Sequence, residues 1–231
     1  KNSTYVGDPI NAVRIFNQLE VDELIIYDID ATKRGSIDFD TIQNVASECF
    51  MPLMYGGGVS CIDDYKSLFN LGVEKVSVST AAIDTPDLIQ EAAKIFGSQS
   101  VVATLDVKRG FWRKKYGVYS RSGKENVKCD PLEKALELLR YGIGELVINN
   151  IDRDGTWNGY DIELLRGIAD ELPIPVVACG GAGSLADLSE VIQQTKINAV
   201  AIGSMTVFQA KEMGVLINFP KPQQLDELFR K

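Results

Sequence analysis

Residues 145–156 read ELVINNIDRDGT, an apolar run that leads directly into a polar loop. Residues 23–32 read ELIIYDIDAT and nearly repeat that pattern in the first half of the chain. A second pair stands at almost the same interval, because MYGGG at residues 54–58 is answered by ACGGAG at residues 178–183. Two matched motifs at one spacing indicate an internal duplication, and a repeat this long predicts a doubled half-domain and not a solenoid.

Short apolar runs alternate with helical patterns along most of the chain, as in strand 75–80 followed by helix 85–96. Continuous apolar strands that alternate with helices predict a parallel sheet covered on both faces. The alternation is interrupted between residues 108 and 128, where Phe111 and Trp112 precede a turn-like stretch and a second short strand pattern. We expect a hairpin there, lying over the end of the preceding strand.

The duplication favours closure of the sheet into a barrel, because two equal half-sheets can close on each other. We therefore expect a single α/β domain over residues 1–231, a (βα)8 TIM barrel with half-barrels at about 1–98 and 99–231. The sequence predicts seven barrel strands, whereas this architecture has eight. By the symmetry of the repeat, the counterpart of strand 100–106 falls before Lys1, so we expect the first strand to be absent from this chain.

The chain is acidic, with a net charge of −8, and contains no stripe of Lys and Arg. Nucleic acids and anionic membranes attract clustered basic residues, so we expect neither as a partner. No apolar run approaches the roughly 18 residues of a membrane span. Any anion that the protein binds is expected to be held locally, by backbone N–H groups or helix ends.

The four cysteines, Cys49, Cys61, Cys129 and Cys179, lack the close spacing of a zinc site. They predict reduced thiols in a cytoplasmic protein, and neither a metal nor a cofactor is expected. The chain contains no histidine, which removes the commonest general base and the usual catalytic triads. Acid–base chemistry is therefore expected to depend on carboxylates.

Four loops of small residues follow predicted strands, at 56–58, 79–80, 180–183 and 203–204. In a barrel of parallel strands these loops lie at the carboxyl ends, where the working residues of such barrels gather. Glycine lets the backbone approach a ligand closely, and a helix that follows offers free N–H groups to a phosphate. Since the loops form one adjacent pair in each half, they predict two phosphate sites that face each other across the barrel mouth.

Aspartates stand at the ends of three predicted strands: Asp106, Asp28 and the pair Asp152 and Asp154. A carboxylate at the tip of an apolar strand is the expected general acid or base in a protein without histidine. Each of them fits equally a structural role, as a helix cap or as an ion-pair partner. We expect Asp106 to be the catalytic one.

Three charged residues, Glu23, Lys75 and Glu145, begin strands and so face the opposite end of the barrel. That end ordinarily serves stability. The residues alone leave two interpretations open, a structural cluster of charges or a gate.

The sequence at these strand ends is similar to that of one family, the cyclase subunits of imidazole glycerol phosphate synthase. The resemblance runs over nearly the whole chain, in KVSVSTAA at 75–82, FGSQSVV at 96–102, LDVKR at 105–109, IDRDGT at 151–156 and CGGAG at 179–183. It implies a doubled (βα)8 barrel paired with a class I glutamine amidotransferase. It also implies that ammonia from that partner crosses the barrel and reacts with a bisphosphorylated ribonucleotide, which gives imidazole glycerol phosphate and an aminoimidazole carboxamide ribotide.

The resemblance implies roles for particular residues of the mouth. Asp106 matches the second catalytic aspartate of the family, whose first belongs to the absent strand. The two phosphate sites of the family match Gly58, Ser79 and Thr80 on one side, and Asp154, Gly155, Gly181, Gly203 and Ser204 on the other.

The resemblance also implies roles at the opposite end. Glu23, Lys75 and Glu145 match three members of a salt-bridge gate at the ammonia entrance of the family. Glu74 and Gln99 match positions of the interface with the amidotransferase. The gate interpretation is thereby favoured over the structural one.

The chain departs from the family at several positions. Ser79 replaces a usual asparagine, and Asn149 and Asn150 replace a usual Thr-Ser. Residues 110–112, 5–9 and 215–220 resemble a second-copy branch that accompanies genes for surface polysaccharides and is similar to ammonia suppliers of a sugar amidotransferase. Three hypotheses follow: a cyclase of histidine synthesis, such a paralogue, or a non-catalytic barrel scaffold. The sister isomerase of histidine synthesis is disfavoured because it needs no ammonia gate.

Overall fold

The structure is a computed structural model that describes residues 4–110, 115–211 and 213–229. It contains one nine-stranded sheet, in which seven strands follow one another in the order β1-β2-β3-β4-β7-β8-β9. The bounds of these seven strands are β1 Leu24–Tyr27, β2 Leu53–Gly56, β3 Lys75–Val78, β4 Val101–Arg109, β7 Glu145–Asn150, β8 Val176–Cys179 and β9 Ala199–Ala201.

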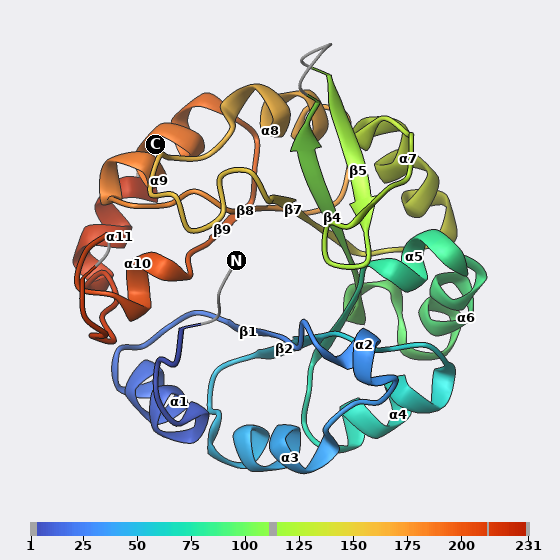
Figure 1. The fold of residues 1–231 in the computed structure, drawn as a ribbon, viewed down its shortest axis with the longest axis horizontal. Helices are drawn as coiled ribbons and strands as arrows, with labels where there is room; N and C mark the ends of the chain where they lie inside the picture. The colour runs from blue at the N-terminus through green and yellow to red at the C-terminus, as the bar shows by residue number, and fades with distance from the viewer. Residues whose placement is uncertain (1–3, 111–114, 212, 230–231) are drawn as a thin grey trace.

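All neighbours along this path pair in parallel. The sheet curls into a ring, and the helices surround it (Figure 1). The predicted (βα)8 TIM barrel is confirmed as the architecture. Among the described residues β1 and β9 form the two ends of the path, so each pairs with one barrel neighbour. The expected eighth strand before Lys1 and the division of one domain into two half-barrels stay predictions.

The helices occupy the connections between strands. Their bounds are α1 Pro9–Gln18, α2 Ala31–Arg34, α3 Phe39–Glu48, α4 Ile62–Asn70, α5 Thr80–Asp84, α6 Asp87–Phe96, α7 Pro131–Tyr141, α8 Ile162–Ala169, α9 Leu185–Gln194, α10 Ser204–Val207 and α11 Pro222–Phe229, with a 3-10 turn η1 at Ser98–Ser100.

Local sequence explains where the longer helices begin. The Asp8 carboxylate accepts a hydrogen bond from the backbone N–H of Asn11, and Pro9 is the first helical residue of α1. Asp130 and Pro131 repeat this arrangement at α7. A capping carboxylate followed by proline satisfies an otherwise free N–H and fixes the first turn, so both helices begin where the sequence predicts.

The interruption after β4 is a hairpin, as the sequence predicts. β4 pairs antiparallel with β5, Tyr116–Ser120, which in turn pairs with β6, Glu125–Asn126. Figure 1 shows β4 and β5 projecting together beyond the ring of strands. Phe111 and Trp112, which the sequence places beside the hairpin turn, lie outside the described residues.

The strand that carries Asp106 is longer than expected. We predicted that it ends at Asp106, but β4 continues to Arg109 because residues 106–109 pair with β5 after the barrel pairing with β7 runs out at Val107. Asp106 therefore lies inside a strand and is held by neighbours on both sides.

Two short helices also differ from expectation. The small-residue loops at Ser79 and Gly203 lead directly into α5 and α10, each of which is a single short turn of helix. The expected short tail after residue 215 also includes a helix, α11.

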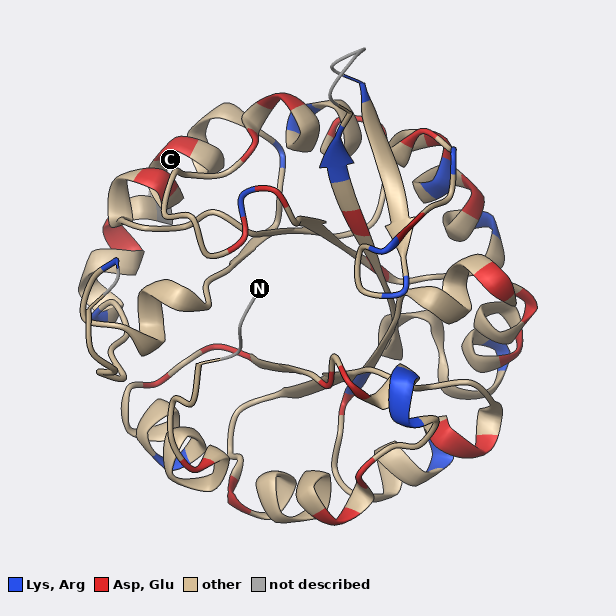
Figure 2. Ribbon diagram, in the orientation of Figure 1, with Lys and Arg blue, Asp and Glu red and all other residues tan. Residues whose placement is uncertain are grey.

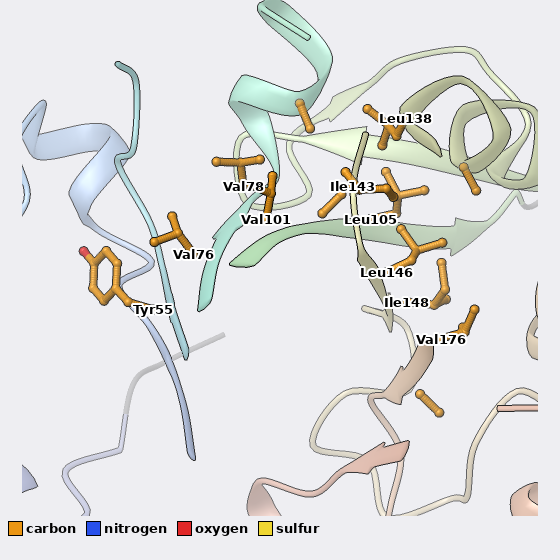
Figure 3. Packing of buried hydrophobic residues seen from close by; sticks show 14 of the residues in the cluster. Tyr55, Val76, Val78, Val101, Leu105, Leu138, Ile143, Leu146, Ile148 and Val176 are labelled. Carbon is orange, nitrogen blue, oxygen red and sulfur yellow. The ribbon is translucent and has the colours of Figure 1, made fainter. Parts of the chain in front are cut away.

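The largest apolar core lies between the sheet and the ring of helices. Figure 3 shows Tyr55, Val76, Leu105 and Leu146 of the strands on the same side as Leu138 of α7. A second and smaller cluster of buried side chains consists of Met54, Val102, Val147 and Val177. These four alternate along their strands with outward residues, so they occupy the interior of the ring.

Within the described residues, every helix is either too short or too polar to cross a membrane.

Leu146→Ala tests the outer core. The Leu146 side chain is 0% exposed, so its truncation leaves a cavity, and we expect a loss of about 2–5 kcal/mol in the free energy of unfolding in urea. The control is Leu216→Ala, because Leu216 is 53% exposed, and it is expected to change stability by about 0.5 kcal/mol or less. Equal losses for the two variants contradict this packing.

Candidate active site

Asp106 and Asn149 meet at the carboxyl end of the barrel. They are register partners on the neighbouring strands β4 and β7, and their side chains point to the same face. The Asn149 Nδ2 amide donates a hydrogen bond of 2.8 Å to Asp106 Oδ1. The catalytic candidate is thus anchored on two rigid strands.

Burial raises the pKa of the Asp106 carboxyl, and the nearby charge of Asp154 acts in the same direction. The Asn149 amide and the charge of Lys108 oppose the shift without cancelling it. A carboxyl with a raised pKa exchanges a proton more readily near neutral pH than an ordinary aspartate does. This is the property that a general acid or base requires.

Two of the other strand-end aspartates have structural roles. Asp28 accepts hydrogen bonds from the backbone N–H groups of Asp30 and Ala31 and pairs with Arg34 at 2.7 Å. Asp152 accepts a 2.8 Å bond from the backbone N–H of Arg109, which ties the β7 loop to β4. Both carboxylates therefore hold loops in place, which is the structural role that the sequence left open for them.

Asp154 and Gly155 lie in the turn after β7. The backbone N–H of Asp154 donates to the Asn150 carbonyl at 2.9 Å, and Gly155 has a φ of +67°. The charge of Asp154 contributes to the pKa shift of Asp106, so this turn borders the mouth.

The first predicted phosphate site brings together the loops after β2 and β3, which are neighbouring strands. Gly58 has a φ of +70°, and a Cβ there would lie 2.8 Å from the Ala31 Cβ, so the loop requires glycine. Ser79 is the residue before α5, and Thr80 begins that helix. The structure therefore brings Gly58, Ser79 and Thr80 to one edge of the mouth.

A residue that sequence reasoning missed covers this first loop pair. The backbone N–H of Arg121 donates to Thr80 Oγ1 at 3.3 Å, while its guanidinium pairs with Asp84 at 3.1 Å and Glu125 at 2.9 Å. Arg121 belongs to the hairpin turn and has a positive φ of 52°. No local pattern links it to α5, because the contact depends on the fold of the hairpin.

The second predicted phosphate site combines the loops after β8 and β9, again neighbouring strands. Gly181 has a φ of +118°, and a side chain there would collide with the carbonyl of Gly159. The backbone N–H of Gly159 donates a hydrogen bond of 2.9 Å to the carbonyl of Gly181. Gly203 precedes α10 with open space around its Cα, and Ser204 begins the helix. Gly181, Gly203 and Ser204 thus also gather at the mouth.

At the opposite end of the barrel, Lys75 joins two carboxylates. Its Nζ donates to Glu23 Oε2 and to Glu145 Oε2, at 2.8 Å in both cases. Lys75 and Glu145 are the first residues of β3 and β7, and Glu23 directly precedes β1. The predicted convergence of these three charges is confirmed. Figure 2 shows most other charged residues on the helices, on the loops and on the projecting end of β4.

The electrostatics of this cluster depend on pairing. Burial opposes the charge of Lys75, but the hydrogen bonds and charges of Glu145 and Glu23 outweigh it and raise the pKa of the ammonium. Burial also raises the pKa of Glu23, against the effect of Lys75. Glu23 Oε1 is buried and has no hydrogen-bond partner among the described residues. The cluster is therefore a closed but incompletely satisfied arrangement.

Glu74 and Gln99 lie on the same face of the barrel as the Lys75 cluster. Glu74 directly precedes β3, and Gln99 belongs to η1, directly before β4. Both residues are exposed. Within the part of the chain that the structure describes, no group of three or more His, Cys, Asp or Glu side chains could hold a metal ion.

The fold and its two ends define a class of protein, a (βα)8 barrel with a buried carboxyl and glycine-rich loops at the carboxyl ends of its strands and a charged cluster at the amino ends. A family model described as histidine biosynthesis protein matches residues 1–211. The chain belongs to this histidine biosynthesis family.

Curated relatives agree with this assignment. The chain is 48% identical to the putative imidazole glycerol phosphate synthase subunit hisF2 of Pseudomonas aeruginosa, over 98% of this chain and 90% of the relative. It is 40% identical to the putative subunit hisF3 of Vibrio vulnificus, over 97% and 86%. It is 37% identical to the imidazole glycerol phosphate synthase subunit HisF of Lactococcus lactis, over 93% and 86%.

The raised pKa of Asp106 makes a prediction about stability. The folded chain keeps the Asp106 proton at a pH where the unfolded chain, with a carboxyl pKa of about 3.9, has released it. Stability is therefore lost as the pH rises through the folded pKa. Asp106→Asn keeps an oxygen that accepts the hydrogen bond from the Asn149 amide, and it removes the buried charge. We expect this variant to raise the melting temperature at pH 7.5 by about 2–4 °C.

The gain of Asp106→Asn should shrink as the pH is lowered from 7.5 to 4, because a larger fraction of the aspartate of the parent is then protonated as well. Asp63→Asn is the matched control, since the Asp63 side chain is 85% exposed and should give little change at either pH. A gain of equal size at both pH values would show that burial of the charge is not its cause.

Proposed function

We propose that the chain is the cyclase subunit of a glutamine-dependent imidazole glycerol phosphate synthase. In this reaction ammonia from a glutaminase partner is combined with a bisphosphorylated ribonucleotide, which is split into imidazole glycerol phosphate and an aminoimidazole carboxamide ribotide. The names of the relatives from Lactococcus lactis and Pseudomonas aeruginosa support the assignment.

One observation carries the proposal, the placement of two different charged sites at opposite ends of one barrel. Asp106 is the proposed acid–base residue at the mouth, where burial raises its pKa. Lys75, bound to Glu23 and Glu145, is the proposed gate at the other end. A barrel that only isomerised a substrate at the mouth would have no use for a paired cation at the far end.

The mouth suits a substrate with two phosphates. We assign Gly58, Ser79 and Thr80 to one phosphate, and Asp154, Gly155, Gly181, Gly203 and Ser204 to the other. Backbone N–H groups at glycine turns and at the first turns of α5 and α10 are suitable donors to such anions. The acidic net charge of the chain makes local donors of this kind necessary.

The partner is proposed to be a class I glutamine amidotransferase that docks on the face containing Glu74 and Gln99. This face surrounds the Lys75 cluster, and both residues are exposed on it. The proposed location is the cytoplasm, where the four free thiols of the chain stay reduced.

A second candidate function is favoured by one contact. The Asn149 amide donates a hydrogen bond directly to Asp106. The resembled family has threonine at the position of Asn149. An amide donor stabilises the charged carboxylate more firmly than a hydroxyl that can also accept, which weakens Asp106 as a base and leaves it protonated less often. In this alternative the barrel delivers ammonia to a sugar amidotransferase of surface-polysaccharide synthesis, and the mouth no longer cyclises a ribonucleotide.

The two proposed phosphate sites predict two bound anions. Crystals soaked in sulfate should contain one anion beside Gly58 and Thr80 and another beside Gly181 and Ser204, because both loops offer N–H groups to an anion. Ser79→Asp should remove only the first anion, and Ser204→Asp only the second, since an added carboxylate repels sulfate. Anions found only elsewhere in the crystal would contradict the assignment.

The whole proposal is tested with the natural protein co-expressed with the amidotransferase that is encoded beside it. We expect a stable complex with glutamine-dependent cyclase activity. Asp106→Asn should lower cyclase turnover by about 10²–10⁴-fold with ammonium salts as well as with glutamine. Lys75→Ala should instead leave assembly intact and reduce only the glutamine-dependent reaction.

Lys66→Ala is the control for Lys75→Ala, because Lys66 pairs with Asp63 on the outer surface of α4. A complex that transfers ammonia but lacks cyclase activity supports the alternative function. No association at micromolar concentrations would exclude both.

A further inference from the structure

Tyr27 reaches across the interior of the barrel. It is the last residue of β1, yet its hydroxyl lies 2.8 Å from Thr104 Oγ1 on β4. Two strands, β2 and β3, separate β1 from β4 in the sheet. The phenol ring therefore spans the inner faces of β2 and β3.

Gly56 makes this position of the ring available. Gly56 is the register partner of Tyr27 on β2 and of Ser77 on β3. A Cβ at residue 56 would lie 2.9 Å from both Cδ1 and Cε1 of the Tyr27 ring and 3.1 Å from the Ser77 carbonyl. A side chain of any other residue would push the ring away, so glycine and tyrosine fit each other here.

A pair of buried hydroxyls holds the far end of the ring. Thr104 is 5% exposed and Ser77 is 1% exposed, and their Oγ atoms lie 2.7 Å apart. Burial raises the pKa of the Tyr27 phenol, so it stays neutral at ordinary pH. The bond to Thr104 thus joins neutral groups and can be opened without moving a charge through the barrel.

Alternate residues of β4 give the level at which the ring lies. Val102, Thr104 and Asp106 face the interior in succession, since side chains two residues apart share one face of a strand. Val102 belongs to the inner apolar cluster, and Asp106 belongs to the mouth. The Thr104 anchor lies between them.

The charged cluster lies on the amino-end side of these levels. Lys75 at the start of β3 is two residues before Ser77, and Glu145 at the start of β7 is two residues before Val147 of the inner apolar cluster. From the amino end to the carboxyl end, the interior therefore contains the Lys75 cluster, an apolar layer, the Tyr27 ring and then Asp106.

We propose that Tyr27 is a specificity-determining residue of the barrel interior, a ring latched to Thr104 that separates the apolar layer from the mouth. Because the ring crosses the inner faces of β2 and β3 to reach Thr104, it narrows the interior at this level. A small neutral molecule passes when the latch opens, whereas hydrated ions and larger molecules are held back. The identity of that molecule as ammonia rests on the proposed function, but the barrier itself does not.

A cysteine introduced at Val147 is a reporter for the barrier that needs no enzyme activity. Val147 lies on β7, belongs to the inner apolar cluster and is 0% exposed. A thiol buried in this apolar layer reacts slowly with thiol reagents. Serine at positions 49, 61, 129 and 179 leaves the introduced cysteine as the single thiol of the chain.

The test measures the rate at which methyl methanethiosulfonate labels the cysteine of Val147→Cys in this background, by intact-mass spectrometry at pH 8. We expect Tyr27→Ala to raise the rate by roughly tenfold, because the barrier is removed. Tyr27→Phe keeps the ring and loses the latch, so its rate should lie between those of the parent and Tyr27→Ala. Tyr5→Ala is the matched control, since Tyr5 is 84% exposed, and it should leave the rate unchanged.

Thr104→Val provides a second variant of nearly the same volume, in case Tyr27→Ala does not fold. It removes the anchor and should raise labelling as Tyr27→Phe does. The proposal would be overturned if folded Tyr27→Ala were labelled at the rate of the parent. It would also be overturned if the two single variants Tyr27→Phe and Thr104→Val, both folded, were labelled at that rate. Labelling needs neither substrate nor partner, so the absence of cyclase activity would not affect the conclusion about the Tyr27 barrier. A failed labelling test would likewise leave the proposed function untouched.

Discussion

The strands of the barrel all run in one direction, and this common direction determines which side chains meet. Every neighbouring pair along the path from β1 to β9 is parallel, so all amino ends meet at one face and all carboxyl ends at the other. Residues far apart in the chain are thereby sorted by their place within a strand. Lys75 and Glu145 meet because both begin a strand, and Asp106 meets Asn149 because both lie near the carboxyl ends.

The alternation of side chains along a strand adds a second kind of order. Glu145, Val147 and Asn149 place an ionic group, an apolar group and an amide at successive levels of the interior. An ammonium ion without a partner would pay tens of kcal/mol to enter an apolar layer of low dielectric, whereas neutral ammonia has no such penalty. The layered interior therefore selects for a neutral molecule.

Much of this arrangement could be predicted from the sequence. Repeated motifs and the alternation of strands and helices predict the barrel, and strand starts predict the meeting of Glu23, Lys75 and Glu145, which the structure confirms. These predictions succeed because they depend on the period of the pattern and on strand direction alone. The position of a residue within a strand is a local property of the chain.

Contacts that depend on long-range geometry could not be predicted. The extension of β4 beyond Asp106 is decided by pairing with the hairpin, and the bond from the Arg121 backbone to Thr80 depends on where that hairpin lies. The reach of Tyr27 to Thr104 depends on the missing side chain of Gly56, two strands away from the anchor. Whether Asp28 is catalytic or structural was also open, until its bonds to Arg34 and to the turn that follows decided it.

Transfer of nitrogen through the barrel interior, from the Lys75 face to the mouth of Asp106, can be measured with labelled glutamine. The most direct measurement supplies the complex with its amidotransferase with ¹⁵N-amide glutamine in the presence of excess unlabelled ammonium chloride and follows the label in the product by mass spectrometry. If nitrogen travels through the interior, nearly all product nitrogen carries ¹⁵N whatever the ammonium concentration. If the ¹⁵N fraction of the product instead falls as the concentration of unlabelled ammonium rises, ammonia enters the mouth from solvent. That result would contradict transfer through the interior.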